Sequence, residues 1–319
     1  MNVLSLFDGM SCGQLALQRA DIDVENYFAC EIDKYAMQIT QKNFPNTIQL
    51  GDVTTANHYF DKDVDLLMGG SPCQGFSFAG HQLNFDDPRS KLFFEFVKAK
   101  DAVKPKYFLL ENVRMKKESQ DVITKYLGVE PIAINSALMS AQNRNRLYWT
   151  NIPNVTQPQD KGIVLSDILE DLPFDEAPNY LKGTWCGRVR GDLVKSVDDD
   201  KAHCLTASMY KGQIPTFVKS KKPIQVGVAN DIKGFDIIKR VYSPQGKSPT
   251  LTTMQGGHRQ PKVAMDNLYR KLTPLECERL QTLPDNYTEG VSNTQRYKMI
   301  GNGWTVDVIA HILKGIKNG

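Results

Sequence analysis

MNVLSLFDGMSCG, residues 1–13, holds the pattern that decides the fold. A short apolar run, Val3–Phe7, ends directly at the turn residues Asp8 and Gly9. The apolar spacing over Leu15–Arg19 then predicts a short helix. A buried strand followed by a glycine turn and a helix is typical of the first unit of an α/β fold. We therefore expect the chain to open as strand, loop and helix.

The same alternation continues through the first 150 residues. Short apolar runs indicate strands, and apolar residues at helical spacing indicate helices. We predict helices over Lys34–Asn43 and Lys91–Val103, and strands over Tyr27–Glu31, Ile48–Leu50, Val64–Met68, Tyr107–Leu110, Ile132–Leu138 and Arg146–Thr150. This order predicts an α/β fold with a doubly wound, mainly parallel sheet.

Length and composition exclude several classes of protein. The chain has 319 residues, of which 41% are hydrophobic and 24% charged, so we expect an ordinary soluble globular protein and not a disordered one. At about 150 residues per domain we expect two domains. No apolar run approaches the roughly 20 residues that a membrane span needs. The first residues have no basic segment, so we expect no secretory signal.

The six cysteines are widely spaced, without any C-x-x-C pair (Cys12, Cys30, Cys73, Cys186, Cys204 and Cys277). This spacing argues against a disulfide framework and against a zinc site, and we predict no bound metal. We expect the protein to act in the reducing cytoplasm.

The amino-acid composition changes beyond Ile152. Gly, Pro, Ser and Thr become frequent, and we interpret about 170–270 as a separate, loop-rich, mainly β domain. Residues 161–271 carry 18 basic and 12 acidic side chains, whereas residues 1–160 carry 16 and 19. This distribution favours contact with a polyanion, although a surplus of this size is also common on ordinary surfaces. Further helices are predicted from Thr273-Pro274 and over Thr305–Lys314.

Five predicted strands end in polar, small or reactive residues. These ends are residues 7–13, Glu31, Asp52, residues 72–74, and Glu111 with Asn112. In an open parallel sheet, ligands bind at the carboxyl ends of the strands. The five strand ends therefore predict a single site.

The glycines at 9 and 13 let the backbone approach a ligand, and Glu31 is placed to accept ribose hydroxyls. Tight strand-to-helix turns also use glycine for geometry alone, and Asp52 is either an adenine contact or a turn residue. The spacing is not G-x-G-x-x-G, and no Lys or Arg lies nearby to hold a phosphate. A nucleoside without phosphates therefore suits the loop better than a nicotinamide dinucleotide, which argues against a dehydrogenase.

Three further positions are candidates for chemistry. Cys73 follows Gly-Gly-Ser-Pro at a strand end, where a thiolate can attack an electrophilic carbon, although most free cysteines are buried and inert. Glu111 is either a solvated strand end or a protonated hydrogen-bond donor. Arg144 and Arg146 occupy alternate positions and would share a face of an extended segment, either as a surface pair or around a planar group.

Taken together, these residues resemble one family, the C5-cytosine DNA methyltransferases, over about 1–150 and 240–319. The matching motifs occur in the family's linear order. They are Phe7-x-Gly9 with Gly13, Glu31-Ile32-Asp33, Gly51-Asp52-Val53, Pro72-Cys73-Gln74, Glu111-Asn112-Val113, Gln142-x-Arg144-x-Arg146, the segment from Arg270 to Pro284, and Gly301-Asn302 with Thr305-Val306.

The resemblance implies a fold and an activity. The fold would be that of S-adenosylmethionine-dependent methyltransferases, with a catalytic domain of residues 1–168 plus 298–319. Residues 169–297 would form a smaller, mainly β target-recognition domain and hinge. The activity would be methyl transfer from S-adenosylmethionine to C5 of a flipped-out cytosine in a specific duplex DNA sequence, with a covalent bond from Cys73 to C6 and S-adenosylhomocysteine as product.

The resemblance also assigns site residues. The catalytic residues would be Cys73, Glu111, Asn112, Arg144 and Arg146. The cofactor-binding residues would be Phe7, Asp8, Gly9, Met10, Ser11, Cys12, Gly13, Glu31, Ile32, Asp52, Val53, Pro72, Asn302, Gly303 and Trp304. The DNA-binding residues would be Gln74, Ser77, Arg89, Arg188, Arg240, Thr250, Gly256 and Gly257.

The sequence departs from the bacterial pattern in two places. The first loop is F-x-G-x-x-x-G, which is similar to that of the vertebrate de novo DNA methyltransferases, and Ile32 stands where many members have an aromatic residue. We expect a monomer that acts on double-stranded DNA and does not bind a membrane. A restriction endonuclease that recognises the same DNA sequence is a candidate partner. The alternatives are a tRNA cytosine methyltransferase and a catalytically silent DNA-binding relative.

Overall fold

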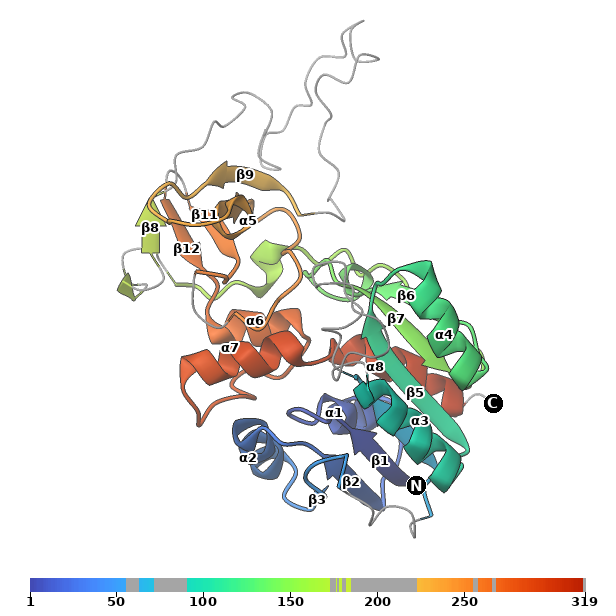
Figure 1. Cartoon of the computed structure of the whole chain (residues 1–319). Helices are drawn as coiled ribbons and strands as arrows, with labels where there is room; N and C mark the ends of the chain where they lie inside the picture. Colours follow the sequence, from blue (N-terminus) through green and yellow to red (C-terminus); the bar gives the residue numbers. More distant parts are fainter. Residues whose placement is uncertain are drawn as a thin grey trace, which may run out of the picture.

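The computed structural model describes residues 1–55, 63–71, 91–172, 176, 178–179, 182–184, 223–254, 258–265 and 268–317. In Figure 1 these residues form two parts, each built around a sheet, with two helices between them. Within the described ranges, no helix is both long and apolar enough to cross a membrane.

Seven strands form the larger sheet. They are β1 (Asn2–Leu6), β2 (Asn26–Cys30), β3 (Ile48–Gln49), β4 (Leu66–Gly69), β5 (Tyr107–Val113), β6 (Ile132–Asn135) and β7 (Asn145–Thr150). Their spatial order is β3-β2-β1-β4-β5-β7-β6. The first five are parallel, whereas β7 runs antiparallel to both β5 and β6. The predicted α/β fold with a mainly parallel sheet is therefore confirmed.

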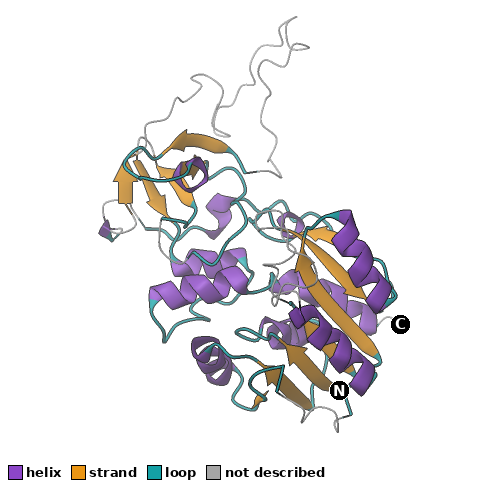
Figure 2. Ribbon diagram, in the orientation of Figure 1, coloured by secondary structure: helices purple, strands orange, loops and turns teal. Residues whose placement is uncertain are grey.

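Helices cover both faces of this sheet, as Figure 2 shows. One face packs against α1 (Cys12–Arg19), α2 (Lys34–Asn43) and α8 (Val306–Leu313), and the other against α3 (Lys91–Val103) and α4 (Lys117–Leu127). Successive strand residues point to opposite faces. Val3 accordingly belongs to the first core and Leu4 to the second. This alternation decides which strand side chains lie on the same face of the larger sheet.

The smaller sheet has five strands in the order β8-β12-β11-β10-β9. Its elements are β8 (Lys182–Thr184), β9 (Gln225–Val228), α5 (Asp236–Lys239), β10 (Arg240–Tyr242), β11 (Lys262–Met265) and β12 (Leu268–Lys271). Between the sheets lie α6 (Pro274–Leu280) and α7 (Asn293–Asn302). Short 3-10 turns occur at Ser136–Leu138, Leu165–Ile168 and Lys314–Ile316.

The start of α6 follows the sequence signal. Thr273 is the N-cap, Pro274 occupies the first turn, and Glu276 and Thr273 form a reciprocal capping box. The buried carboxylate of Glu276 also accepts two hydrogen bonds from Arg270, at 2.8 and 2.6 Å. Because each charge satisfies the other, the end of the smaller sheet is fixed to the helix that follows it.

Two expectations about boundaries were wrong. The strand predicted over Ile132–Leu138 ends at Asn135, whose side chain caps the 3-10 turn that follows. The strand predicted to end at Leu110 continues to Val113 because β7 pairs with it as far as Arg146. Glu111 and Asn112 therefore lie within a strand rather than after one.

Candidate active site

The parallel register aligns four positions just beyond the ends of the paired segments. Leu6 pairs with Cys30 and with Gly69, and Gly69 pairs with Leu110. The residues that follow are Phe7, Glu31, Gly70 and Glu111, so they form a row across one edge of the larger sheet. The structure therefore brings together three of the five predicted strand ends, at Phe7, Glu31 and Glu111, and Gly70 lies between them.

Residues 7–13, which we call the glycine loop, leave β1 in an unusual conformation. Phe7, Gly9 and Ser11 have φ values of 57°, 61° and 60°, all in the left-handed region. Ser11 then serves as the N-cap residue of α1. Only glycine adopts this conformation without strain, so the surroundings must hold the other two residues in place.

Asp8 is the main polar anchor of the glycine loop. Its carboxylate accepts a hydrogen bond of 2.7 Å from the Tyr27 hydroxyl and another from the Ser11 hydroxyl. Its backbone N–H donates to the carbonyl of Cys30 at 3.1 Å. Burial raises the pKa of Asp8 to about 6, against the lowering effect of these hydroxyl donors.

Glu31 faces the same loop from the end of β2. Its Oε2 accepts the N–H of Gly9 at 2.8 Å, and its Oε1 accepts the N–H groups of Ile32 and Asp33, each at 2.8 Å. A carboxylate has about four acceptor positions, so one stays open for a ligand. The neighbouring Ile32 is 75% exposed, and an apolar side chain at this edge is suited to the face of a base.

Asp52 and Val53 follow β3 farther along the edge. Asp52 is exposed, and its Oδ1 accepts from the N–H and the hydroxyl of Thr54 at 2.9 and 2.8 Å. Val53 is buried in the core on the α3 side of the sheet. Asp52 thus forms the turn that the sequence left open as an alternative.

The turn after α7, with Asn302, Gly303 and Trp304, closes the site from the C-terminal side. A Cβ atom built on Gly13 would lie 3.5 Å from Cζ3 of Trp304, and one built on Gly70 would lie 2.9 Å from its Nε1. The indole therefore spans from the glycine loop to the end of β4. Gly303 itself is in close contact with Met10 and Cys12 of that loop. Asn302 is exposed.

Glu111 lies beside this indole. The Gly70 Cβ position is 3.2 Å from Oε2 of Glu111, and Arg146 places its Nε 2.9 Å from Oε1 of the same carboxylate. Arg146 pairs with Val113 in the register of β5 and β7, so it is a diagonal neighbour of Glu111 on the same face of the sheet. An acid and an arginine thus sit next to the segment that leads to residue 73.

Asn112 points to the opposite face of the sheet from Glu111. Its Nδ2 donates to the hydroxyl of Ser71 at 3.1 Å, and its Oδ1 accepts the N–H of Val113 at 2.8 Å. Both Asn112 and Ser71 are buried. Asn112 therefore anchors the chain directly before Pro72.

Arg144 has different surroundings from Arg146, although their alternate spacing predicts that the two share a face of an extended segment. It precedes β7, is 3% exposed, and donates to the carbonyls of Leu251, Gly301 and Gly303 at 3.2, 3.3 and 3.0 Å. Burial, with Arg146 nearby, lowers its pKa. Its guanidinium thus links the start of β7, in the larger sheet, to the turn that carries Trp304.

A buried polar network that the sequence did not reveal surrounds this arginine. Gln281 donates to the carbonyls of Ile300 and Gly303 at 2.8 and 3.1 Å and accepts from Thr305 at 2.8 Å. Gln142 accepts the N–H of Leu251 at 3.1 Å, and Ser136 donates to Thr305 at 2.9 Å. Their only sequence signal is that Gln142 and Gln281 lie within the motifs quoted above.

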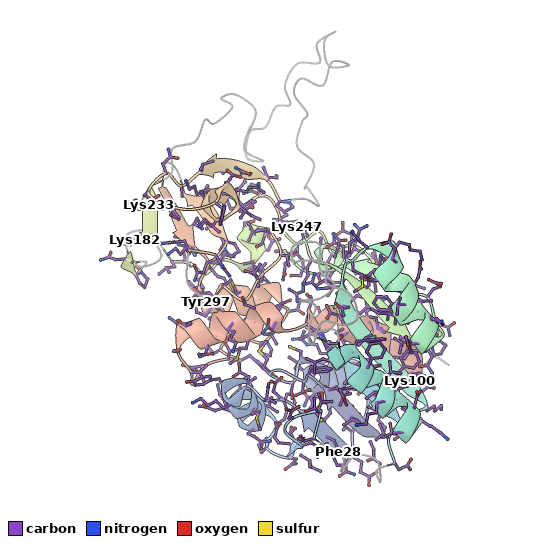
Figure 3. The ribbon with its side chains drawn as sticks, in the orientation of Figure 1. Phe28, Lys100, Lys182, Lys233, Lys247 and Tyr297 are labelled. Carbon is purple, nitrogen blue, oxygen red and sulfur yellow. The ribbon has the colours of Figure 1, made fainter. Side chains whose placement is uncertain are left out.

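Lys247 is a second residue that the sequence did not single out. It is 1% exposed, and its ammonium donates to the carbonyls of Ala137, Ser140 and Ile163. Figure 3 shows it where the two parts of the molecule meet. Lys247 therefore holds the segment after β10 against the segments that follow β6 and β7.

Several predicted site residues lie outside the described residues. These are Pro72, Cys73, Gln74, Ser77, Arg89, Arg188, Gly256 and Gly257. Two predicted DNA contacts are described. Arg240 pairs with Asp236 at 2.9 Å on the surface, and the hydroxyl of Thr250 donates to the carbonyl of Asn143 at 2.7 Å. In the part of the chain that is described, no group of three or more His, Cys, Asp or Glu side chains is placed to hold a metal ion.

Comparisons with known proteins show which proteins the chain is similar to. A family model described as "C-5 cytosine-specific DNA methylase" matches residues 1–318. The type II methyltransferase M.NlaX of Neisseria lactamica is 30% identical, with 99% of this chain and 96% of that protein covered. The type II methyltransferase M.HhaI of Haemophilus parahaemolyticus is 27% identical, with 99% and 94% covered.

Phage proteins and solved structures match over similar lengths. The orphan methyltransferase M.SPBetaI of Bacillus phage SPbeta is 28% identical over 98% of this chain and 97% of its own. The crystal structure of the S. pombe Dnmt2 methyltransferase aligns with a TM-score of 0.64 and 17% identity, with 99% of both chains covered. At that identity the structure supports the fold alone.

Proposed function

Because the chain belongs to the C-5 cytosine-specific DNA methylase family and is a C5-cytosine DNA methyltransferase, we propose that it uses S-adenosylmethionine and a covalent bond from Cys73 to C6 of a flipped-out cytosine. One observation carries this proposal. Glu111, which is paired with Arg146, and Trp304 converge at Gly70, three residues before Cys73. A base that reached this thiol would therefore meet an acid, an arginine and the cofactor side of the site.

The described residues fit S-adenosylmethionine. Gly13 and Gly70 leave the space against the Trp304 indole that a Cβ would fill, and Glu31 keeps one acceptor position for ribose. Ile32 offers an exposed apolar surface to adenine, with Asp52 and Val53 beyond it. The remaining residues of the glycine loop, with Pro72 and Asn302, complete the proposed site. When bound, S-adenosylmethionine supplies an electrophilic methyl group on a sulfonium centre.

The side chains of this protein would activate the cytosine. The Cys73 thiolate adds to C6, and this addition turns C5 into a nucleophile that takes the methyl group. Glu111 donates a hydrogen bond to N3 and stabilises the negative charge that develops on the ring. Arg146 holds Glu111 and the O2 edge of the base. A base or water then takes the C5 proton, and the electrons of the C5–H bond restore the C5–C6 double bond and expel the Cys73 thiolate.

Two predicted catalytic residues take supporting roles in this proposal. Asn112 holds Ser71, and through it fixes the direction in which the chain leaves β4 toward Cys73. Arg144 holds the carbonyls of Leu251, Gly301 and Gly303, and so fixes the turn before Trp304. Both residues would position catalytic groups without touching the base.

We assign residues 1–168 plus 298–319 to a catalytic domain and residues 169–297 to target recognition and the hinge. The surplus of basic side chains in residues 161–271 supports duplex DNA as the substrate, because phosphate contacts supply most of the affinity for DNA. Gln74, Ser77, Arg89, Arg188, Arg240, Thr250, Gly256 and Gly257 are the proposed DNA contacts. We place the enzyme in the cytoplasm as a monomer, with a restriction endonuclease of the same site as a candidate partner.

Duplex DNA containing 5-fluorocytosine tests the proposal. The fluorine cannot leave as a proton, so the enzyme with S-adenosylmethionine should form a denaturation-resistant complex with this DNA. Cys73→Ser should form none. The target sequence must first be found by bisulfite sequencing of DNA from cells that express the chain. Absence of a complex with that DNA, or transfer to tRNA in its place, would refute the proposal.

A further inference from the structure

Tyr27 contacts both ends of the glycine loop, although it lies on the neighbouring strand β2. Its hydroxyl donates to Oδ1 of Asp8 at 2.7 Å, and the side chain is 3% exposed. A Cβ atom built on Gly13 would lie 2.9 Å from the same hydroxyl oxygen. The tyrosine therefore supports the loop from the side away from solvent.

The glycine loop needs such support because its conformation is strained. Phe7 and Ser11 adopt the left-handed region, which costs a side-chain-bearing residue roughly 1 kcal/mol or more. Asp8 sits between them, accepts a hydrogen bond from Ser11, and donates its N–H to Cys30. The orientation of Asp8 thus determines the course of the loop, and Tyr27 is the residue that fixes this orientation from another strand.

We propose that Tyr27 is a positioning residue for the methyl donor, because it holds Asp8 and thereby keeps the glycine loop in the conformation that binds the nucleoside. This inference rests on the proposed function of the loop. Tyr27 touches neither the base nor the reacting atoms, so its removal affects cofactor binding more than the chemical step.

The charge state of Asp8 gives this role a specific signature. The groups that face Asp8 are the hydroxyls of Ser5 and Ser11 from β1 and α1, the thiols of Cys12 and Cys30, the carboxylate of Glu31, and the phenols of Tyr27 and Tyr287. The Tyr27 hydroxyl stabilises the carboxylate and so lowers the pKa of Asp8. Its loss raises that pKa, and the loop then loses its anionic anchor at a higher pH.

The test is the dissociation constant of S-adenosylmethionine, measured by calorimetry without DNA between pH 5.5 and 8.5. In Tyr27→Phe we expect binding to weaken about tenfold at pH 7.5, with kcat on saturating DNA and cofactor changed less than threefold. The pH below which binding weakens should move upward. The matched control is Tyr297→Phe, another buried tyrosine, whose hydroxyl donates to the carbonyl of Leu272 at 2.7 Å and not to a residue of the glycine loop. It should leave both the affinity and its pH dependence unchanged.

A double-mutant cycle with Asp8→Asn decides whether Tyr27 acts through Asp8. The two substitutions should be strongly non-additive for cofactor binding, and Asp8→Asn should remove the pH dependence. Additive effects, unchanged affinity in Tyr27→Phe, or an equal loss in Tyr297→Phe would each overturn the inference. If the wild-type protein bound no S-adenosylmethionine, the proposed function itself would fail, which distinguishes the two outcomes.

Discussion

Nε of Arg146 lies 2.9 Å from Oε1 of Glu111, and the two side chains are only 13% and 11% exposed. The pair joins β5 to β7 across an antiparallel contact, at the place where the parallel part of the sheet ends. Arg146 thus orients an acid whose other oxygen faces Gly70 and the site. Because β7 runs antiparallel to β5, Arg146 at its start lies opposite Val113, two residues beyond Glu111, within reach of the carboxylate.

Glu111→Gln should keep DNA and cofactor binding but slow methyl transfer by about 10²–10⁴-fold. Glutamine can still accept a hydrogen bond from Arg146, but it cannot exchange a proton with N3 of the base. Single-turnover transfer of a labelled methyl group, measured beside DNA affinity, checks this expectation. A rate within threefold of wild type would show that Glu111 does not assist the chemical step.

Arg144→Lys should lower both stability and cofactor affinity. An ammonium cannot reproduce the planar fork that reaches three carbonyls, and each buried carbonyl left without a donor costs about 1–3 kcal/mol. Urea unfolding and calorimetry measure the two effects. Arg240→Lys is the control, since its surface pair with Asp236 is worth less than about 1 kcal/mol. Equal midpoints for the two variants would contradict the expected role.

Gly301→Ala offers a test in which two physical effects have opposite signs. Helix propensity alone favours alanine within α7 by about 1 kcal/mol. However, the new Cβ would lie 1.8 Å from the carbonyl oxygen of Thr252, which is backbone and cannot move aside cheaply. We expect a net loss of about 3 kcal/mol or more in the free energy of unfolding.

The control for this substitution is Gly128→Ala. Gly128 has φ 76° and no atom within 4 Å of its Cβ position, so only the conformational penalty of about 1 kcal/mol applies. Denaturant unfolding of both variants gives the comparison. A Gly301→Ala protein as stable as wild type would mean that the contact with Thr252 is looser than described.

Asp8 should make the stability of the ligand-free enzyme depend on pH. The folded-state pKa of about 6 lies above the usual aspartate value near 3.9, so folding favours the protonated form. The stabilising contribution is complete below about pH 4 and is lost as the pH rises through 6. Asp8→Asn should therefore be more stable than wild type at pH 8, by up to about 2 kcal/mol.

Urea unfolding of wild type and Asp8→Asn at pH 4.5 and pH 8 measures this effect. The stability difference between the two proteins should shrink at the lower pH, where the wild-type carboxyl is protonated as well. If the difference stayed constant, Asp8 would titrate at its ordinary value.

The sequence was sufficient to predict the strand-and-turn frame of the site. Apolar runs that stop at Asp8-Gly9, Glu31 and Gly69-Gly70 identify the strand ends by local chemistry alone. The helices Lys34–Asn43 and Lys91–Val103 were predicted with the bounds that the structure has, and both are confirmed. These features depend on side chains near in sequence.

Features that depend on distant contacts were not predictable in this way. Alternate spacing suggested one face for Arg144 and Arg146, but Arg144 precedes β7 and is bound by carbonyls from residues more than 100 positions away. No helix was predicted over Asn293–Asn302, because its sequence is polar and carries Gly301 just before its end, a glycine whose place is set by the backbone of Thr252. The helix Lys117–Leu127 also lacked a prediction, although Gly128 follows it in the left-handed conformation typical of a helix end.

The packing of α1 against α8 sets an order of events during protein synthesis. Leu15 and Leu17 at the start of the chain share one apolar core with Val308 and Ile312 near its end. The indole of Trp304, which borders the glycine loop, arrives with the same late segment. The first helix can therefore complete its apolar contacts only after residues 306–313 have been synthesised. The side of the site that Trp304 borders is likewise incomplete until residue 304 has been made.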